Sequence, residues 1–171
     1  MIRRLIHRKI DQSEQALGQS HDYLRFMLDI SLRAFLSFSK IFAIANYRKV
    51  LPLDIYHTAR IVAAREEDCG TCVQLEINLA QKAGVSSTVL QSIINAEPQC
   101  LSNQLDLVYR YVDAVVKKLP TEMDLREKIK PIVGDQGFVE LALAVGASRF
   151  LPIVKRMLGY GTACSKVELK I

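Results

Sequence analysis

The sequence predicts an all-α protein, folded as a single-domain helical bundle of about seven helices. Half of its 171 residues are hydrophobic, yet it contains only 8 glycines and 5 prolines. Apolar residues recur with helical spacing along nearly the whole chain, and no segment shows the strict alternation that is typical of a half-buried strand. A chain of this length can bury a sizeable core in one domain without disulfide staples.

Seven helical segments follow from this periodicity. The predicted helices cover residues 21–43, 54–66, 69–83, 86–97, 101–118, 125–130 and 136–158. Asp54, Asp68 and Asp135 are expected to cap three of them, because a short acidic side chain accepts from the free backbone N–H groups of a first turn. Ser86 or Ser87 is expected to open the fourth. Gly84 is expected to end the helix before it, since glycine readily takes the left-handed backbone conformation.

The net charge of +5 is concentrated at the N-terminus. Four of the 23 basic residues lie within the first ten, where no acidic residue stands, so that 19 basic and 18 acidic residues remain in the rest of the chain. We therefore divide the chain into a basic N-terminal arm, residues 1–20, and a helical domain, residues 21–171. The arm is expected to fray or to pack on the domain, with a weak membrane-surface or partner-binding helix as the alternative. No basic stripe with interleaved aromatic residues follows, so a nucleic-acid partner is not expected.

The most apolar stretch, Tyr23 to Ala45, contains charged residues along its whole length. They are Arg25, Asp29, Arg33 and Lys40. A membrane span of that length should carry almost no charge, so stable membrane insertion is not expected. The first residues also lack the apolar run of a signal peptide, and a cytoplasmic protein is predicted. In the cytoplasm, paired cysteines indicate catalysis or metal binding rather than a structural staple.

Of the four cysteines, only Cys69 and Cys72 have an informative spacing. Cysteines three residues apart at a helix start lie on one face, where the partial positive charge of the helix N-terminus favours a thiolate. A second thiol beside the first can resolve a sulfenic acid or a mixed disulfide. The remaining two, Cys100 and Cys164, are interpreted as incidental.

Two other interpretations of the pair remain open. A zinc site needs two more ligands, and neither a second C-x-x-C nor an H-x-x-x-H is present, although Glu76 and His57 could complete a mixed site. The pair could also be two buried, inert cysteines. We favour redox chemistry, with no metal and no bound cofactor; the sequence also lacks a glycine-rich phosphate loop.

The region from Tyr56 to Ala96 resembles the core of the carboxymuconolactone decarboxylase and alkylhydroperoxidase D-like superfamily. The similar text is HTARIVAAREEDCGTCVQLEINLAQKAGVSSTVLQSI, in which a helix leads into C-x-x-C and the cysteine helix ends in Ala-Gly before a short polar link. The peroxidase motif of that family is Glu, eleven residues, C-x-x-C, three residues, His. Here His57 and Glu76 stand at the two outer positions, so the spacing is kept and the two residue types are exchanged.

The resemblance implies an alkylhydroperoxidase D-like fold and a catalytic set of Cys72, Cys69, Glu76 and His57. In this set Cys72 attacks a hydroperoxide, Cys69 resolves the product to a disulfide, and the other two residues handle protons. An external thiol, a lipoyl-type or a thioredoxin-type donor would restore the dithiol. Glu66 or Glu67 could supply the carboxylate instead, because both are close to Cys69 in sequence.

The sequence thus predicts a thiol-dependent oxidoreductase, a peroxidase or disulfide reductase that reduces hydroperoxides. The alternative is a non-enzymatic oligomeric redox sensor or binding scaffold of the same fold; a decarboxylase or a purely structural protein is less well supported. A homo-oligomer is also predicted, because the segment 21–43 carries more large apolar residues than one buried stripe needs. The resemblance implies a trimer or hexamer.

Overall fold

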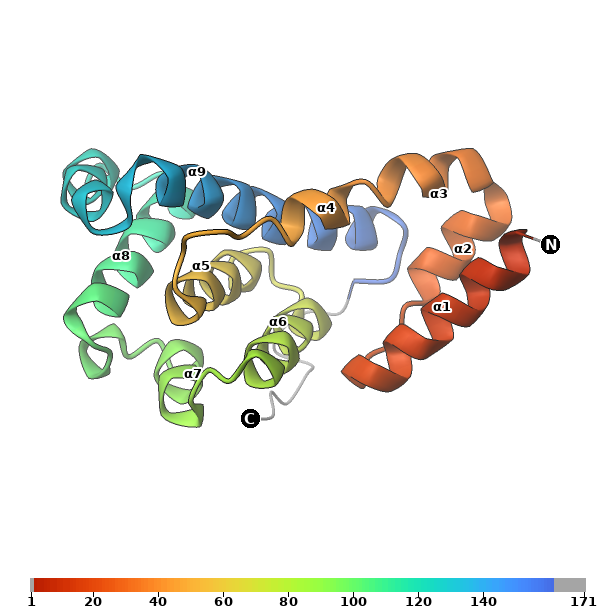
Figure 1. Cartoon of the computed structure of the whole chain (residues 1–171), viewed down its shortest axis with the longest axis horizontal. Helices are drawn as coiled ribbons and strands as arrows, with labels where there is room; N and C mark the ends of the chain where they lie inside the picture. The colour runs from red at the N-terminus through yellow and green to blue at the C-terminus, as the bar shows by residue number, and fades with distance from the viewer. Residues whose placement is uncertain (1, 162–171) are drawn as a thin grey trace.

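Every regular element of the computed structural model, which describes residues 2–161, is a helix (Figure 1). The α-helices are α1 (Ile2–Leu17), α2 (Asp22–Ile30), α3 (Leu32–Phe38), α4 (Ile41–Ala45), α5 (Leu53–Arg65), α6 (Gly70–Ala83), α7 (Ser87–Ile94), α8 (Asn103–Lys117) and α9 (Glu122–Met157), with a 3-10 turn at Pro98–Cys100. The prediction of an all-α, single-domain protein is confirmed. Cys164 lies outside the described residues.

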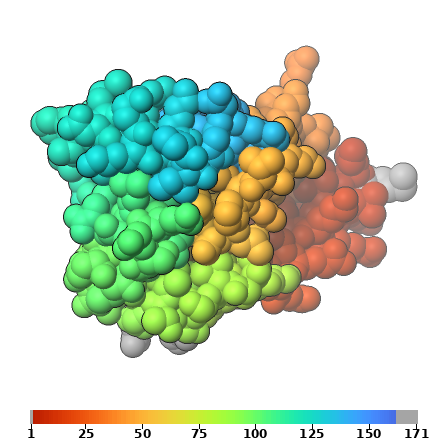
Figure 2. Space-filling view, turned by 60° about the vertical axis from the view of Figure 1, so that its left-hand side comes forward, coloured from red at the N-terminus to blue at the C-terminus, as the bar shows by residue number. Residues whose placement is uncertain are grey.

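The central helix is α5, which packs against α6, α8 and α9 (Figure 1). All residues from Ile55 to Ala64 are buried, so this helix is covered on every side. A helix in that position must be apolar almost all round, and small side chains such as Ala59 and Ala63 let its neighbours approach closely. Figure 2, turned by 60° from Figure 1, shows the start of α5 and the loop before it between α9 and α6.

The prediction of a single helix for residues 21–43 is wrong, because the segment forms α2, α3 and α4. At Ser31 the backbone is extended, with φ −149° and ψ 104°, and the serine side chain accepts from the N–H of Ala34 to cap α3. The break lets the broad apolar face fold back on itself. Together with α1, this face forms a second small core, which is separate from the main core around α5. Its buried residues are Ile10, Tyr23, Leu24, Leu28 and Phe35.

The predicted helix ends are partly confirmed. Gly84 ends α6 with a left-handed φ of 95°, and Ser86 caps α7 by accepting from a backbone N–H. Asp54 and Asp68 do not cap their helices, because Pro52 and Cys69 occupy those positions. Asp54 instead lies in the first turn of α5, and Asp68 takes a positive φ of 47° in the turn before α6.

The two helices predicted for residues 125–130 and 136–158 together correspond to α9. The helix is interrupted at Gly134, where φ 69° and ψ 171° are not helical, one residue before the predicted cap Asp135. By length and composition alone α9 could cross a membrane. Core helices of water-soluble proteins meet the same criteria, and α9 packs against α4, α5 and α8.

The loop before α5 is fixed to α9 by Glu140. This carboxylate is fully buried and accepts from the N–H groups of Val50 and Leu51 at 3.0–3.1 Å. Burial alone would raise the pKa of Glu140, but the backbone donors outweigh it and hold the pKa below its ordinary value. The contact holds the two residues that precede Pro52, the N-cap of α5, against α9.

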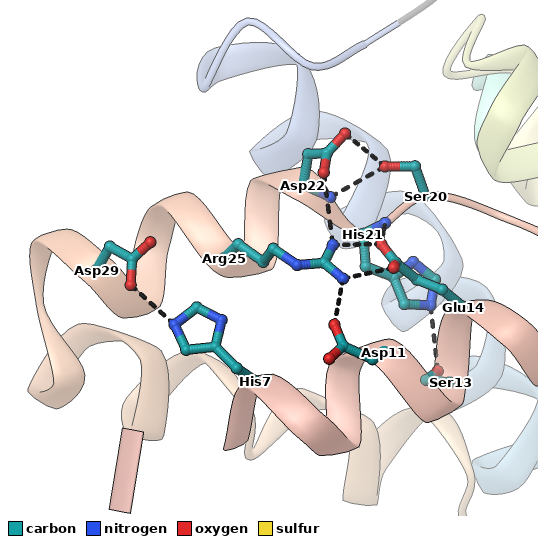
Figure 3. Close-up of polar contacts among 9 residues, drawn as sticks. All are labelled: His7, Asp11, Ser13, Glu14, Ser20, His21, Asp22, Arg25 and Asp29. Carbon is teal, nitrogen blue, oxygen red and sulfur yellow. Dashed lines mark hydrogen bonds and ion pairs between the residues drawn. The ribbon is translucent and has the colours of Figure 1, made fainter. Parts of the chain in front are cut away.

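Most of the basic N-terminal arm, Ile2–Leu17, forms α1, which lies beside α2 at the end of the molecule farthest from α8 (Figure 1). In Figure 3, Arg25 of α2 reaches between Asp11 and Glu14 of α1, with N–O distances of 2.5–2.6 Å. The hydrogen bonds from Arg25 lower the pKa of Glu14 to about 2. The C-terminal end of α1 is also tied to α6, because the side chain of Asn78 donates to the carbonyl of Leu17 at 2.6 Å.

Candidate functional site

Cys69 and Cys72 form a disulfide at the start of α6, with their Cα atoms 5.2 Å apart. Cys69 is the N-cap residue and Cys72 lies in the first turn, where its backbone N–H donates to the carbonyl of Cys69. Cys69 is completely buried, whereas Cys72 is 8% exposed and lines a cavity. Of the two cysteines, Cys72 is therefore the one that a molecule in the cavity would contact.

The cavity has a volume of about 540 Å³ and lies between α6, α9 and the N-terminal helices. Its wall is mostly apolar and includes Ile10, Leu24, Phe35, Leu75, Leu79 and Leu151. Its polar residues include Lys155, Thr71, His21, Arg60 and Glu76. An apolar wall with a few polar groups, in this range of volume, is typical of sites that bind small molecules.

Glu76 lines this cavity one helical turn beyond Cys72, as the predicted motif spacing requires. Its carboxylate is paired in two places with Arg60 of α5, with Nε–Oε2 at 2.7 Å and a second N–O contact at 2.9 Å. Both side chains are only 5% exposed. The partner of this carboxyl group is therefore a buried guanidinium rather than a histidine.

Arg60 makes further contacts that fix its position. Its guanidinium donates to the carbonyl of Ala45 at 2.6 Å and to the hydroxyl of Tyr56 at 2.5 Å, and that hydroxyl in turn donates to the same carbonyl. The pKa of Arg60 is raised, since its ion pair with Glu76 and its contacts with Tyr56 outweigh the cost of burial. Arg60 is not among the site residues predicted from the sequence. An arginine within the otherwise apolar run ARIVAA was the available signal, because a buried charge requires a partner.

His57 is buried in α5 but is not part of the cavity lining. Its Nδ1 atom has no hydrogen-bond partner, and its ring packs edge-on against Tyr56 with the ring centres 5.2 Å apart. Burial, and then the charge of Arg60, lower the pKa of His57 to about 4, although Glu76 opposes this shift. The cavity thus brings together two of the four predicted residues, Cys72 and Glu76, while His57 and Cys69 are buried outside its lining.

Lys155 is a second residue of the site that was not predicted from the sequence. It reaches from α9 to the start of α6, where its Nζ atom donates to Thr71 Oγ1 at 2.7 Å, and Thr71 Oγ1 lies 3.7 Å from Cys69 Sγ. The signal available was spacing, since Ser148, Leu151 and Lys155 recur at intervals of three and four residues on one face of α9. A lysine on such a face is directed toward the interior.

No group of three or more histidine, cysteine, aspartate or glutamate side chains within residues 2–161 is arranged to hold a metal ion. In the mixed zinc site considered from sequence, Glu76 would have to leave Arg60 and both cysteines would have to be reduced. A scan of protein-family models, a search of curated proteins and a search of solved structures each returned no match. The resemblance to the alkylhydroperoxidase D-like superfamily therefore stays a prediction.

The burial of His57 predicts that stability falls on mild acidification. The unfolded chain binds a proton at this side chain near pH 6.5 and the folded protein only near pH 4, so the folded state loses relative stability as the pH falls through this window. The loss expected from His57 between pH 6.5 and 4 is about 2–3 kcal/mol. It is measured by urea unfolding at several pH values.

The matched control for this prediction is His57→Gln, which removes the titrating ring. Its free energy of unfolding should change less than that of the wild type between pH 6.5 and 4. NMR titration of the imidazole signals provides a direct check. A His57 pKa near 6.5 in the folded protein would contradict the prediction.

Proposed function

We propose that the protein is a thiol-dependent oxidoreductase, a peroxidase or disulfide reductase, that reduces hydroperoxides through Cys69 and Cys72. The proposal depends chiefly on one observation: the two cysteines are bonded to each other at a helix start, and Cys72 lines a cavity large enough for a small molecule. The resemblance to the alkylhydroperoxidase D-like superfamily supports the same chemistry.

The proposed reaction begins with the reduced pair. The thiolate of Cys72 attacks the outer oxygen of a hydroperoxide, the O–O bond breaks, and the alkoxide leaves as an alcohol after taking a proton. Cys72 is then a sulfenic acid. The thiol of Cys69 attacks this sulfur, water is released, and the disulfide forms. Two thiols of a lipoyl-type, thioredoxin-type or other donor reduce the disulfide again.

Glu76 and His57 are the proposed proton-handling residues. Glu76 stands one turn from Cys72 as a carboxylate and can accept the proton of the Cys72 thiol. His57 is uncharged at neutral pH, because its pKa is about 4, and its Nδ1 atom has no partner. It also lies outside the lining of the cavity, which assigns it the secondary role in the proposal.

A cytoplasmic homo-oligomer, a trimer or hexamer, remains part of the proposal. A reducing compartment would supply the thiol donors. Oligomer formation is supported by large apolar side chains that stay exposed on the segment expected to meet a partner. They are Phe26, Ile30 and Leu36.

The proposed function is tested by mapping the cysteines after exposure to peroxide. The protein is fully reduced, given one equivalent of cumene hydroperoxide, alkylated, digested and analysed by mass spectrometry. We expect a rapid disulfide between Cys69 and Cys72, with Cys100 and Cys164 alkylated. Alkylation of all four cysteines after prolonged exposure to the hydroperoxide would exclude peroxidase activity.

Turnover separates the enzyme from the alternative, a redox sensor or binding scaffold. With dihydrolipoamide or a thioredoxin system present, an enzyme consumes many equivalents of peroxide for each protein chain. A sensor forms its disulfide once and consumes one equivalent.

A further inference from the structure

We propose that the cavity beside Cys72 binds a carboxylic acid with a long apolar chain, with the carboxylate placed at Lys155 and the chain along the apolar wall. The binding site itself does not depend on any reaction. The inference rests on the proposed function only in its second part, that a hydroperoxide of such an acid is the substrate. This second part uses the reaction described above and adds no step.

The wall of the cavity selects an apolar ligand. Large apolar side chains from the N-terminal helices, α6 and α9 line it, among them Ile10, Leu24, Phe35, Leu75, Leu79 and Leu151. Its volume of about 540 Å³ is far more than hydrogen peroxide occupies. A hydrocarbon chain would replace water against this wall, and each buried CH₂ group contributes about 0.8 kcal/mol.

The charges of the cavity select an acid. Arg60 is neutralised by Glu76, and burial lowers the pKa of His21, whose ring nitrogen contacts Ser13 Oγ at 3.1 Å. Two lysines also line the cavity, the exposed Lys9 and the half-buried Lys155. The lining therefore carries more positive than negative charge.

Lys155 is the group that a carboxylate would pair with. Its Nζ atom donates to a neutral hydroxyl, on Thr71, and lies 5.7 Å from the centre of the Tyr23 ring. Within residues 2–161 no carboxylate lies within ion-pair distance of it. Burial lowers the pKa of Lys155, and Asp22 opposes this only from a distance. A half-buried ammonium without a counter-ion is costly, and the carboxylate of a ligand would remove that cost.

The position of Lys155 brings the ligand to the reactive sulfur. Its contact, Thr71, directly precedes Cys72 on the first turn of α6. A carboxylate held there leaves the chain to run past Cys72 along the wall. A chain carbon that bears a hydroperoxide can then be presented to Cys72.

The test is a fluorescence titration of the oxidised protein with cis-parinaric acid, a fluorescent polyene fatty acid. Saturable binding is expected, and competition by palmitate should be at least tenfold stronger than competition by hexadecanol. Lys155→Met should weaken binding of the acid about 10- to 100-fold, because a charge-assisted hydrogen bond is lost. The affinity of Lys155→Arg for the acid should stay within about threefold of that of the wild type, since the charge is kept.

The matched control is Lys82→Met, which removes an exposed lysine of α6 outside the cavity. Its affinity for cis-parinaric acid should equal that of the wild type, and circular dichroism shows whether each variant keeps its helices. Equal competition by palmitate and hexadecanol, no saturable binding, or unchanged binding by Lys155→Met would each overturn the inference. Because oxidised protein and no peroxide are used, these outcomes are separate from failure of disulfide formation, which would refute the enzyme instead.

Discussion

Replacing Arg60 with methionine is expected to lower the free energy of unfolding by about 3–5 kcal/mol. The substitution leaves the carboxylate of Glu76 buried without the guanidinium that now contacts both of its oxygens. It also removes a donor to the carbonyl of Ala45, although the hydroxyl of Tyr56 still donates to that carbonyl. The largest part of the loss is therefore the cost of a buried, unpaired charge. Urea unfolding at neutral pH measures it.

The double variant Arg60→Met/Glu76→Leu is the control for this interpretation. It removes both charges and keeps an apolar side chain at each position, so most of the lost stability should return. If the double variant is less stable than Arg60→Met, the cost comes from lost packing around α5 instead. A loss below about 1 kcal/mol in the single variant would show that Glu76 is solvated or protonated there.

Replacing Cys72 with serine is expected to slow the reduction of cumene hydroperoxide at least about 100-fold, because a serine hydroxyl is not ionised at neutral pH. Cys69→Ser should behave differently. Its Cys72 still attacks, so one equivalent of peroxide is consumed at close to the wild-type rate. The reaction then stops at a sulfenic acid, which dimedone labelling and mass spectrometry detect on Cys72.

Cys100→Ser is the matched control, since Cys100 is an exposed cysteine outside the pair. Its single-turnover rate and its turnover with a thiol donor should both equal those of the wild type. A faster first reaction in Cys72→Ser than in Cys69→Ser would reverse the assignment of the attacking cysteine. The N-cap position of Cys69 on α6 favours that order, whereas the complete burial of Cys69 in the oxidised protein opposes it.

The local parts of the fold were predictable from the sequence. Apolar spacing defined α5 to α8 to within a few residues, because helix periodicity depends only on neighbours along one segment. Gly84 and Ser86 ended and began helices as expected. The disulfide of Cys69 and Cys72 was also predictable, since cysteines three residues apart at a helix start are close in any fold.

Predictions failed where distant segments decide the conformation. The broad apolar face of residues 21–43 fits one long helix as well as three short ones. The break at Ser31 lets α2 and α3 bury their apolar residues in the small core that they share with α1. The caps expected at Asp54 and Asp68 failed because the turns before α5 and α6 place Pro52 and Cys69 at the N-cap positions. The loop before α5 is held by Glu140, some 90 residues away in sequence, which accepts from the N–H groups of Val50 and Leu51.

The sequence by itself determined an all-α chain with a cysteine pair at a helix start and a carboxylate one turn beyond it. These features depend on spacings of three or four residues within one helix, which backbone geometry alone converts into proximity. Only the tertiary structure decided that Arg60 pairs with Glu76, that His57 is buried away from the cavity, and that Lys155 reaches Thr71 from α9. Those contacts join side chains on different helices, and their formation depends on how the helices pack around α5.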